Sequence, residues 1–95
     1  MQKEYEKAIE LGLEELKSYP NHPNLNMIVG RAYTENKQFE KAIPFLEKGT
    51  VKENNPEWVQ AWSYGYLGKC YYVTNEFQKS KESLTACIKL KATEN

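Results

Sequence analysis

The side chains that could carry catalytic or metal chemistry in this sequence are few and far apart. His22 is the single histidine, and its place between Asn21 and Pro23 suits a solvated turn better than a catalytic base. Cys70 and Cys87 do not form a Cys-x-x-Cys arrangement, and a zinc ion would need further ligands. The five glycines form no phosphate-binding loop. We therefore predict no enzyme activity, no metal site and no cofactor.

The two cysteines fall on the two predicted helices of one helical pair. Cys70 and Cys87 could be close enough to form a disulfide in an oxidising compartment. An isolated cysteine in a helical core is more often a buried free thiol. The sequence favours free thiols and leaves the pairing open.

Aromatic and basic side chains offer a different chemistry, which is recognition. Trp58, Trp62 and Tyr66 are spaced at i, i+4 and i+8, which places them in one row on a helix. Tryptophan, tyrosine and arginine are frequent anchors of protein interfaces. Such a row favours a surface that binds a peptide or a protein. The alternative is that Trp58 and Trp62 pack against a neighbouring helical unit.

The composition restricts the class of partner. The 95 residues carry 13 basic and 13 acidic side chains, and every acidic one is Glu. A net charge of zero gives no field that attracts a polyanion, so we expect no nucleic-acid partner. No apolar run approaches the roughly 20 residues of a membrane span, and the charged start does not resemble a signal peptide. We therefore expect no membrane association and, by default, a cytoplasmic location. Because Glu and Lys favour helices, the composition also predicts an all-α chain.

Breaks in the residue pattern divide the chain into helical segments. The strongest breaks, residues 19–23 and 54–56, combine Pro with Asn. Between the breaks, apolar residues recur with helical spacing, and no alternating strand pattern is present. At the second break Asn55 suits a helix cap and Pro56 suits the first helical position. The five predicted helices cover about residues 3–18, 23–35, 39–51, 56–73 and 76–90.

Motifs of small and aromatic residues recur along the chain. Two motifs return 38 residues later. Gly30-x2-Tyr33 returns as Gly68-x2-Tyr71, and Phe39-x2-Ala42 returns as Phe77-x2-Ser80. A partial copy, Tyr5-x2-Ala8, lies 34 residues before Phe39-x2-Ala42. Because Gly30 and Gly68 lack a Cβ atom, we expect paired helices to approach each other closely at both positions.

These motifs resemble the tetratricopeptide repeat, a helix–turn–helix unit of 34 residues with the signature W-x2-L-G-x2-Y, A-x3-F and P. The matching residues are Asn26-x2-Val29-Gly30-x2-Tyr33 with Ala42-x3-Leu46, and Tyr64-x2-Leu67-Gly68-x2-Tyr71 with Ser80-x3-Leu84. The resemblance implies a right-handed superhelix of antiparallel helix pairs in a single domain over residues 1–95. Its parts would be the second helix of an incomplete unit (1–20), a second unit (21–55) and a third unit (56–95).

In this family the first helix of each unit lines a concave groove that binds peptides or protein segments. By alignment, the predicted peptide contacts are Asn24, Met27, Arg31 and Thr34 in one unit, and Trp62, Lys69 and Tyr72 in the next. Members that bind chaperone tails clamp a C-terminal carboxylate with Lys, Asn and Arg side chains. The matching positions here include Asn24, Ile28, Trp62 and Tyr66. These side chains cannot form that clamp, so the resemblance argues against chaperone C-terminal tails as partners.

The sequence thus favours a protein-interaction scaffold that binds a peptide or a partner segment of unknown identity. One alternative is a structural or self-associating piece of a longer array. In that case Ile9, Leu13 and Leu16 of the first helix would offer an apolar face for self-association. An RNA-binding helical repeat is a weaker alternative, which the zero net charge opposes.

Overall fold

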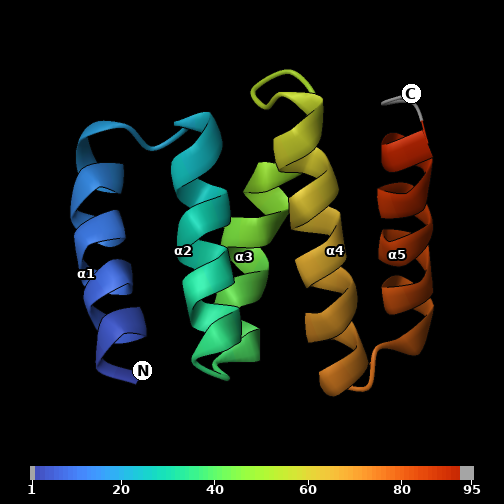
Figure 1. Cartoon of the computed structure of the whole chain (residues 1–95), viewed down its shortest axis with the longest axis horizontal. Helices are drawn as coiled ribbons and strands as arrows, with labels where there is room; N and C mark the ends of the chain where they lie inside the picture. Colours follow the sequence, from blue (N-terminus) through green and yellow to red (C-terminus); the bar gives the residue numbers. More distant parts are fainter. Residues whose placement is uncertain (1, 93–95) are drawn as a thin grey trace.

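The computed structural model describes residues 2–92, and this part of the chain folds into five α-helices without a β-strand. Figure 1 shows the helices side by side, with consecutive helices running in opposite directions and α3 behind α2 and α4. Their bounds are α1 Gln2–Ser18, α2 Pro23–Glu35, α3 Phe39–Gly49, α4 Glu57–Val73 and α5 Phe77–Ala92. The predicted all-α fold class and the number of helices are confirmed. No described helix has the length and apolar character needed to span a membrane.

Each helix packs against the next one in the chain, and α2 also contacts α4. A compact buried cluster forms where α3 meets α4, and it contains Ala42, Leu46, Leu67, Cys70 and Tyr71. Consecutive helices thus build the fold from local contacts, while the α2–α4 contact joins the first helices of two successive pairs. This arrangement places one side of α2 and one side of α4 next to each other.

Within each helix pair, the two helices approach each other closely where a glycine of one meets a leucine of the other. A methyl group added to Gly30 would lie 2.6 Å from a δ-carbon of Leu46, and one added to Gly68 would lie 2.5 Å from a δ-carbon of Leu84. Both distances are too short for a real carbon contact, so only glycine permits this spacing. The expected close approach at the two glycines is confirmed. In the second pair, Ser80 Oγ also donates a 2.7 Å hydrogen bond to the Gly68 carbonyl.

The apolar face of α1 is turned toward the protein. Ile9 is buried, Leu13 and Leu16 are half-buried, and α1 contacts α2. A methyl group at Gly12 would overlap the side chain of Val29 on α2, which shows how closely these helices pack. The face predicted for self-association is therefore not a free surface, because α2 serves as the partner of α1.

Helix starts are formed partly as the sequence predicts. His22 caps α2, since its Nδ1 accepts hydrogen bonds from the backbone N–H groups of Asn24 (3.2 Å) and Leu25 (3.3 Å). At the second break the prediction was wrong, because Pro56 and not Asn55 is the cap residue of α4. The Asn55 side chain donates to the carbonyls of the preceding α3 end and loop, at Lys48 (2.8 Å) and Val51 (2.9 Å). Asn55 therefore closes the loop between α3 and α4 instead of capping α4.

The turns inside the two helix pairs are alike. Lys37 and Asn75 occupy equivalent positions, 38 residues apart, and have positive φ angles of 63° and 67°. After them, the Gln38 N–H bonds to the Tyr33 carbonyl and the Glu76 N–H bonds to the Tyr71 carbonyl, each at 2.8 Å. This is the usual way to end a helix with one left-handed residue. Lysine is unfavourable in that conformation, whereas asparagine tolerates it.

We predict that Lys37→Gly stabilises the chain. Glycine removes the Cβ clash at φ 63° but adds freedom to the unfolded chain, so the net gain in the free energy of unfolding should be about 0.5–1 kcal/mol. Asn75→Gly is the matched control and should gain less. Urea unfolding followed by helical circular dichroism measures both, and an equal or larger gain at Asn75 would contradict this explanation.

Candidate functional site

Two rows of side chains on neighbouring helices form a surface that we call the interaction stripe. Within each row the residues are three or four positions apart, so they share one side of their helix. The rows are Asn24, Ile28, Arg31 and Glu35 on α2, and Trp62, Tyr66, Lys69 and Val73 on α4. None of these eight residues is buried. Since α2 and α4 are in contact, the two rows make one surface.

An aromatic pair lies at the centre of the α4 row. The rings of Trp62 and Tyr66 are stacked, with their centroids 6.0 Å apart, and 48% of Trp62 is exposed. A hollow of about 320 Å³ opens beside them between α4 and α5. Its lining includes both rings together with Gly65, Lys69, Cys87 and Lys91. Lys91 holds its Nζ 5.7 Å from the centroid of the Trp62 ring, which is a cation–π distance.

Charges from α2 reach the aromatic pair on α4. Burial raises the pKa of the Tyr66 hydroxyl, while the nearby Arg31 lowers it and Glu35 raises it. These opposing effects place Arg31 and Glu35 within electrostatic reach of Tyr66. Lys69 adds a second positive charge on the α4 row. The stripe therefore combines an exposed apolar centre with two cations and one carboxylate.

Four of the seven predicted peptide contacts lie on this stripe. They are Asn24, Arg31, Trp62 and Lys69. The sequence prediction did not include Ile28 and Tyr66 among the contacts, although both follow another stripe residue by four positions. That helical spacing from Asn24 and Trp62 was the signal that could have identified them.

The predicted contacts Met27 and Thr34 lie in the core instead. Thr34 is only 1% exposed, and its hydroxyl donates a 2.8 Å hydrogen bond to the Gly30 carbonyl. Its Oγ1 also lies 3.3 Å from Cys70 Sγ on α4. Because each residue turns a helix by about 100°, a shift of one position from the stripe is enough to point a side chain at the neighbouring helix.

Tyr72, the remaining predicted contact, is also off the stripe. It lies 38 residues after Thr34 and so occupies the equivalent place on α4. Unlike Thr34, Tyr72 is 65% exposed. Its ring makes an edge-on contact with Phe77 of α5, with centroids 5.4 Å apart. Tyr72 therefore belongs to the surface that α4 shares with α5.

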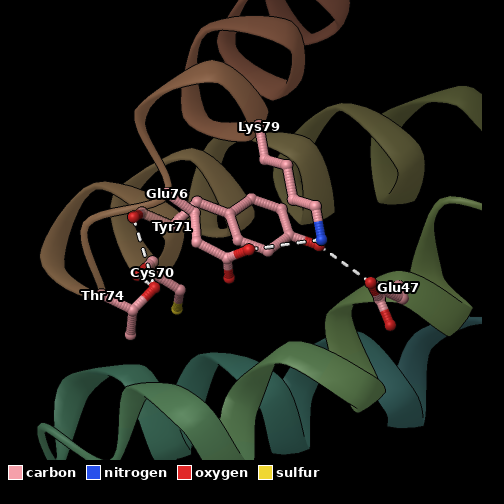
Figure 2. Close-up of polar contacts among 6 residues, drawn as sticks. All are labelled: Glu47, Cys70, Tyr71, Thr74, Glu76 and Lys79. Atoms are coloured by element: carbon pink, nitrogen blue, oxygen red, sulfur yellow. Dashed lines mark hydrogen bonds and ion pairs between the residues drawn. The ribbon is translucent and has the colours of Figure 1, made fainter.

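A polar link that the sequence did not reveal joins α3 to α4. Figure 2 shows the buried Tyr71 donating a 2.8 Å hydrogen bond from its hydroxyl to the Glu47 carboxylate. Lys79, which pairs with Glu76 at 3.3 Å, holds its Nζ 5.6 Å from the centroid of the Tyr71 ring. Burial raises the pKa of Tyr71, and the hydrogen bond and charge of Glu47 raise it further.

We predict that the raised pKa of Tyr71 makes the fold sensitive to alkali. An unfolded tyrosine ionises near pH ~10, whereas folded Tyr71 keeps its proton at higher pH, so the free energy of unfolding falls as the pH rises above about 10. Tyr71→Phe cannot ionise and should reduce this decline, at a cost of about 1 kcal/mol at neutral pH for the lost hydrogen bond. Urea unfolding of both proteins between about pH 7 and about pH 11 tests this. A variant that declines as steeply as the wild type would refute it.

The remaining side chains that could take part in chemical reactions are isolated from one another. Both thiols are free, Cys70 buried and Cys87 half-buried. Burial raises the pKa of Cys70, against the opposing effects of the Thr34 hydrogen bond and the Lys69 charge. Over residues 2–92, no three His, Cys, Asp or Glu side chains gather in a way that could hold a metal ion.

The packing of antiparallel pairs, with matching glycines and matching turns, defines an all-α helical-repeat protein. A family model described as tetratricopeptide repeat matches residues 23–50, which span α2, α3 and the turn between them. The resemblance that the motifs predict is thus confirmed for the segment that forms α2 and α3. No curated protein matches the chain. Repeats of this family are protein–protein interaction modules and typically serve as scaffolds.

Proposed function

We propose that this chain binds a peptide segment of a partner protein along the interaction stripe. The observation that carries the proposal is the stacked, half-exposed Trp62–Tyr66 pair with Arg31 and Lys69 on the same surface. Exposed tryptophan beside cations is the usual composition of an interface hot spot. Asn24 and Ile28 extend the same surface along α2.

The chemistry of the stripe defines the peptide that would fit. An aliphatic or aromatic side chain would contact the Trp62 ring, where it gains apolar burial. Carboxylates on the same peptide would face Arg31 and Lys69, which outnumber the single carboxylate of Glu35 on the stripe. We therefore expect a peptide that combines acidic and apolar residues. A peptide held only by its C-terminal carboxylate is not expected, because Ile28, Trp62 and Tyr66 occupy positions that match the clamp of chaperone-binding family members and cannot hold a carboxylate.

The arrangement of units supports this surface. We propose that α1 is the second helix of an incomplete unit (1–20), that α2 and α3 form the next unit (21–55), and that α4 and α5 form the third (56–95). The equivalent Gly–Leu contacts and left-handed turn residues in the two pairs support this division. Under it, the stripe is formed by the first helices of two successive units.

Peptides that bind the wild-type chain are first selected from a displayed random library. Trp62→Ala should weaken their binding by about tenfold or more, because an interface tryptophan commonly contributes about 2 kcal/mol. Arg31→Ala with Lys69→Ala should weaken binding by a smaller factor and reduce its dependence on salt. Binding can be followed by the fluorescence anisotropy of a dye-labelled peptide, a signal that does not depend on Trp62.

The matched control is Lys41→Ala with Lys48→Ala, which removes two positive charges from exposed positions on α3. This pair should leave both affinity and salt dependence unchanged. If the selected peptides bind the Trp62 and Arg31/Lys69 variants as tightly as the wild type, the interaction stripe is not the peptide-binding surface.

A further inference from the structure

A second apolar surface lies on α5 and the end of α4, and we call it the terminal face. It consists of Tyr72, Phe77, Lys81, Leu84, Cys87 and Ile88. Four of these residues recur at helical spacing and form one row on α5, namely Phe77, Lys81, Leu84 and Ile88. Leu84 is 45% exposed and Ile88 is 68% exposed. An apolar row this open is unusual unless another molecule or segment covers it.

The chain contains an internal copy of this face in which a helix is already seated. Shifting the terminal face by 38 residues gives Thr34, Phe39, Ile43, Leu46, Gly49 and Thr50 on α2 and α3. Leu46 is fully buried, whereas its equivalent Leu84 is 45% exposed. The two leucines meet their own glycines at nearly the same distance, so the helix pairs are built alike. The difference is that α4 covers Leu46.

The contacts of α4 show which side chains such a covering helix needs. Leu67 and Tyr71 of α4 join Leu46 in the buried cluster. A methyl group at Gly49 would overlap Ser63, so a small residue of α4 lies directly on that glycine. Cys70 is a second small residue, against Thr34. A helix seated on the terminal face would therefore carry alternating small and large apolar residues along one side.

The hollow between α4 and α5 lies where that small residue would be placed. Cys87 corresponds to Gly49 and Gly65 to Met27, 38 residues apart in each case. A methyl group at Gly65 would lie 3.6 Å from Cys87 Sγ, which leaves the two positions in ordinary contact beneath the hollow. The volume of about 320 Å³ is open there, whereas Ser63 occupies the equivalent place on Gly49.

Charge distinguishes the possible occupants. The row on α5 contains Lys81 and leads to Lys91, and Lys69 lies at the edge of the hollow. Two copies of the chain that met through this face would bring these lysines together, which is unfavourable. The other end of the molecule offers little to the face, because Leu11 is the exposed large apolar residue among the described residues of α1. A partner helix with acidic side chains avoids the repulsion between lysines and can supply the apolar residues that α1 lacks.

We propose that the terminal face docks an amphipathic α-helix of a partner protein, with acidic side chains flanking its apolar row. The helix packs on α4 and α5 as α4 packs on α2 and α3. This interaction uses the side of α4 that faces α5, which adjoins the interaction stripe at Trp62, Tyr66 and Lys69, and it does not depend on peptide binding there.

The test uses a fluorescent peptide with the sequence of residues 57–73, in which Cys70→Ala prevents disulfide formation. In the acidic form Trp58, Trp62 and Lys69 are changed to Glu, and in the matched basic form the first two are changed to Lys and Lys69 is kept. Fluorescence anisotropy with the whole chain should show the acidic peptide binding at least tenfold more tightly. Lys81→Glu in the chain should reduce or reverse this preference, because it replaces attraction by repulsion.

Two further variants separate the terminal face from other surfaces. Ile88→Gln should weaken binding of the acidic peptide by about tenfold, because it removes an apolar side chain from the centre of the contact. Leu11→Gln, an equally exposed change on α1, and Arg31→Ala on the interaction stripe should have no effect. Circular dichroism confirms that each variant is folded.

The proposal is overturned if the acidic and basic peptides bind alike, or if Ile88→Gln binds the acidic peptide as well as the wild type. It is also overturned if sedimentation shows a dimer of the chain that Ile88→Gln converts to a monomer, since a second copy would then be the occupant. Weaker binding of library-selected peptides to the Arg31→Ala variant, with the acidic helix bound as tightly as before, would show that the two surfaces act separately.

Discussion

The packing of α4 against the α2–α3 pair is the contact on which the rest of this structure depends. Leu46 lies at its centre, held from one side by Gly30 within its own pair and covered from the other by Leu67 and Tyr71 of α4. The Tyr71 hydroxyl then ties α4 to Glu47 on α3. Because interiors are close-packed, these few contacts determine the distance and the rotation of α4 relative to α2. That rotation in turn decides which side chains of both helices reach the solvent.

The interaction stripe is a consequence of this packing. With Thr34 and Cys70 in contact between α2 and α4, one flank of each helix faces the solvent, and Arg31 and Trp62 lie on these flanks. The stripe thus lies on two helices whose relative position is fixed by a core contact rather than by a loop. Side chains on such a rigid support lose little freedom on binding, which favours recognition of an extended partner segment.

The terminal face follows from the same packing rule, applied one repeat later. Each helix pair has one side that accepts the first helix of another unit, and in a repeat protein neighbouring units bury these sides in turn. In this chain the side formed by α2 and α3 is covered, while the side formed by α4 and α5 keeps Leu84 and Ile88 exposed. The charges around that open side are positive, so both proposed surfaces would favour acidic partners.

The sequence by itself determined the fold class, the five helices to within a few residues and the repeat with its paired glycines, because helical periodicity, proline breaks and small residues are local signals. It also indicated an interaction module, through the motifs that resemble the tetratricopeptide repeat. Only the tertiary structure decided that Met27 and Thr34 are buried while Ile28 and Tyr66 face outward. A turn of about 100° per residue makes the exposed face depend on how the neighbouring helix is rotated, and long-range packing alone sets that rotation. For the same reason the Tyr71–Glu47 bond became evident only when distant parts of the chain were placed together.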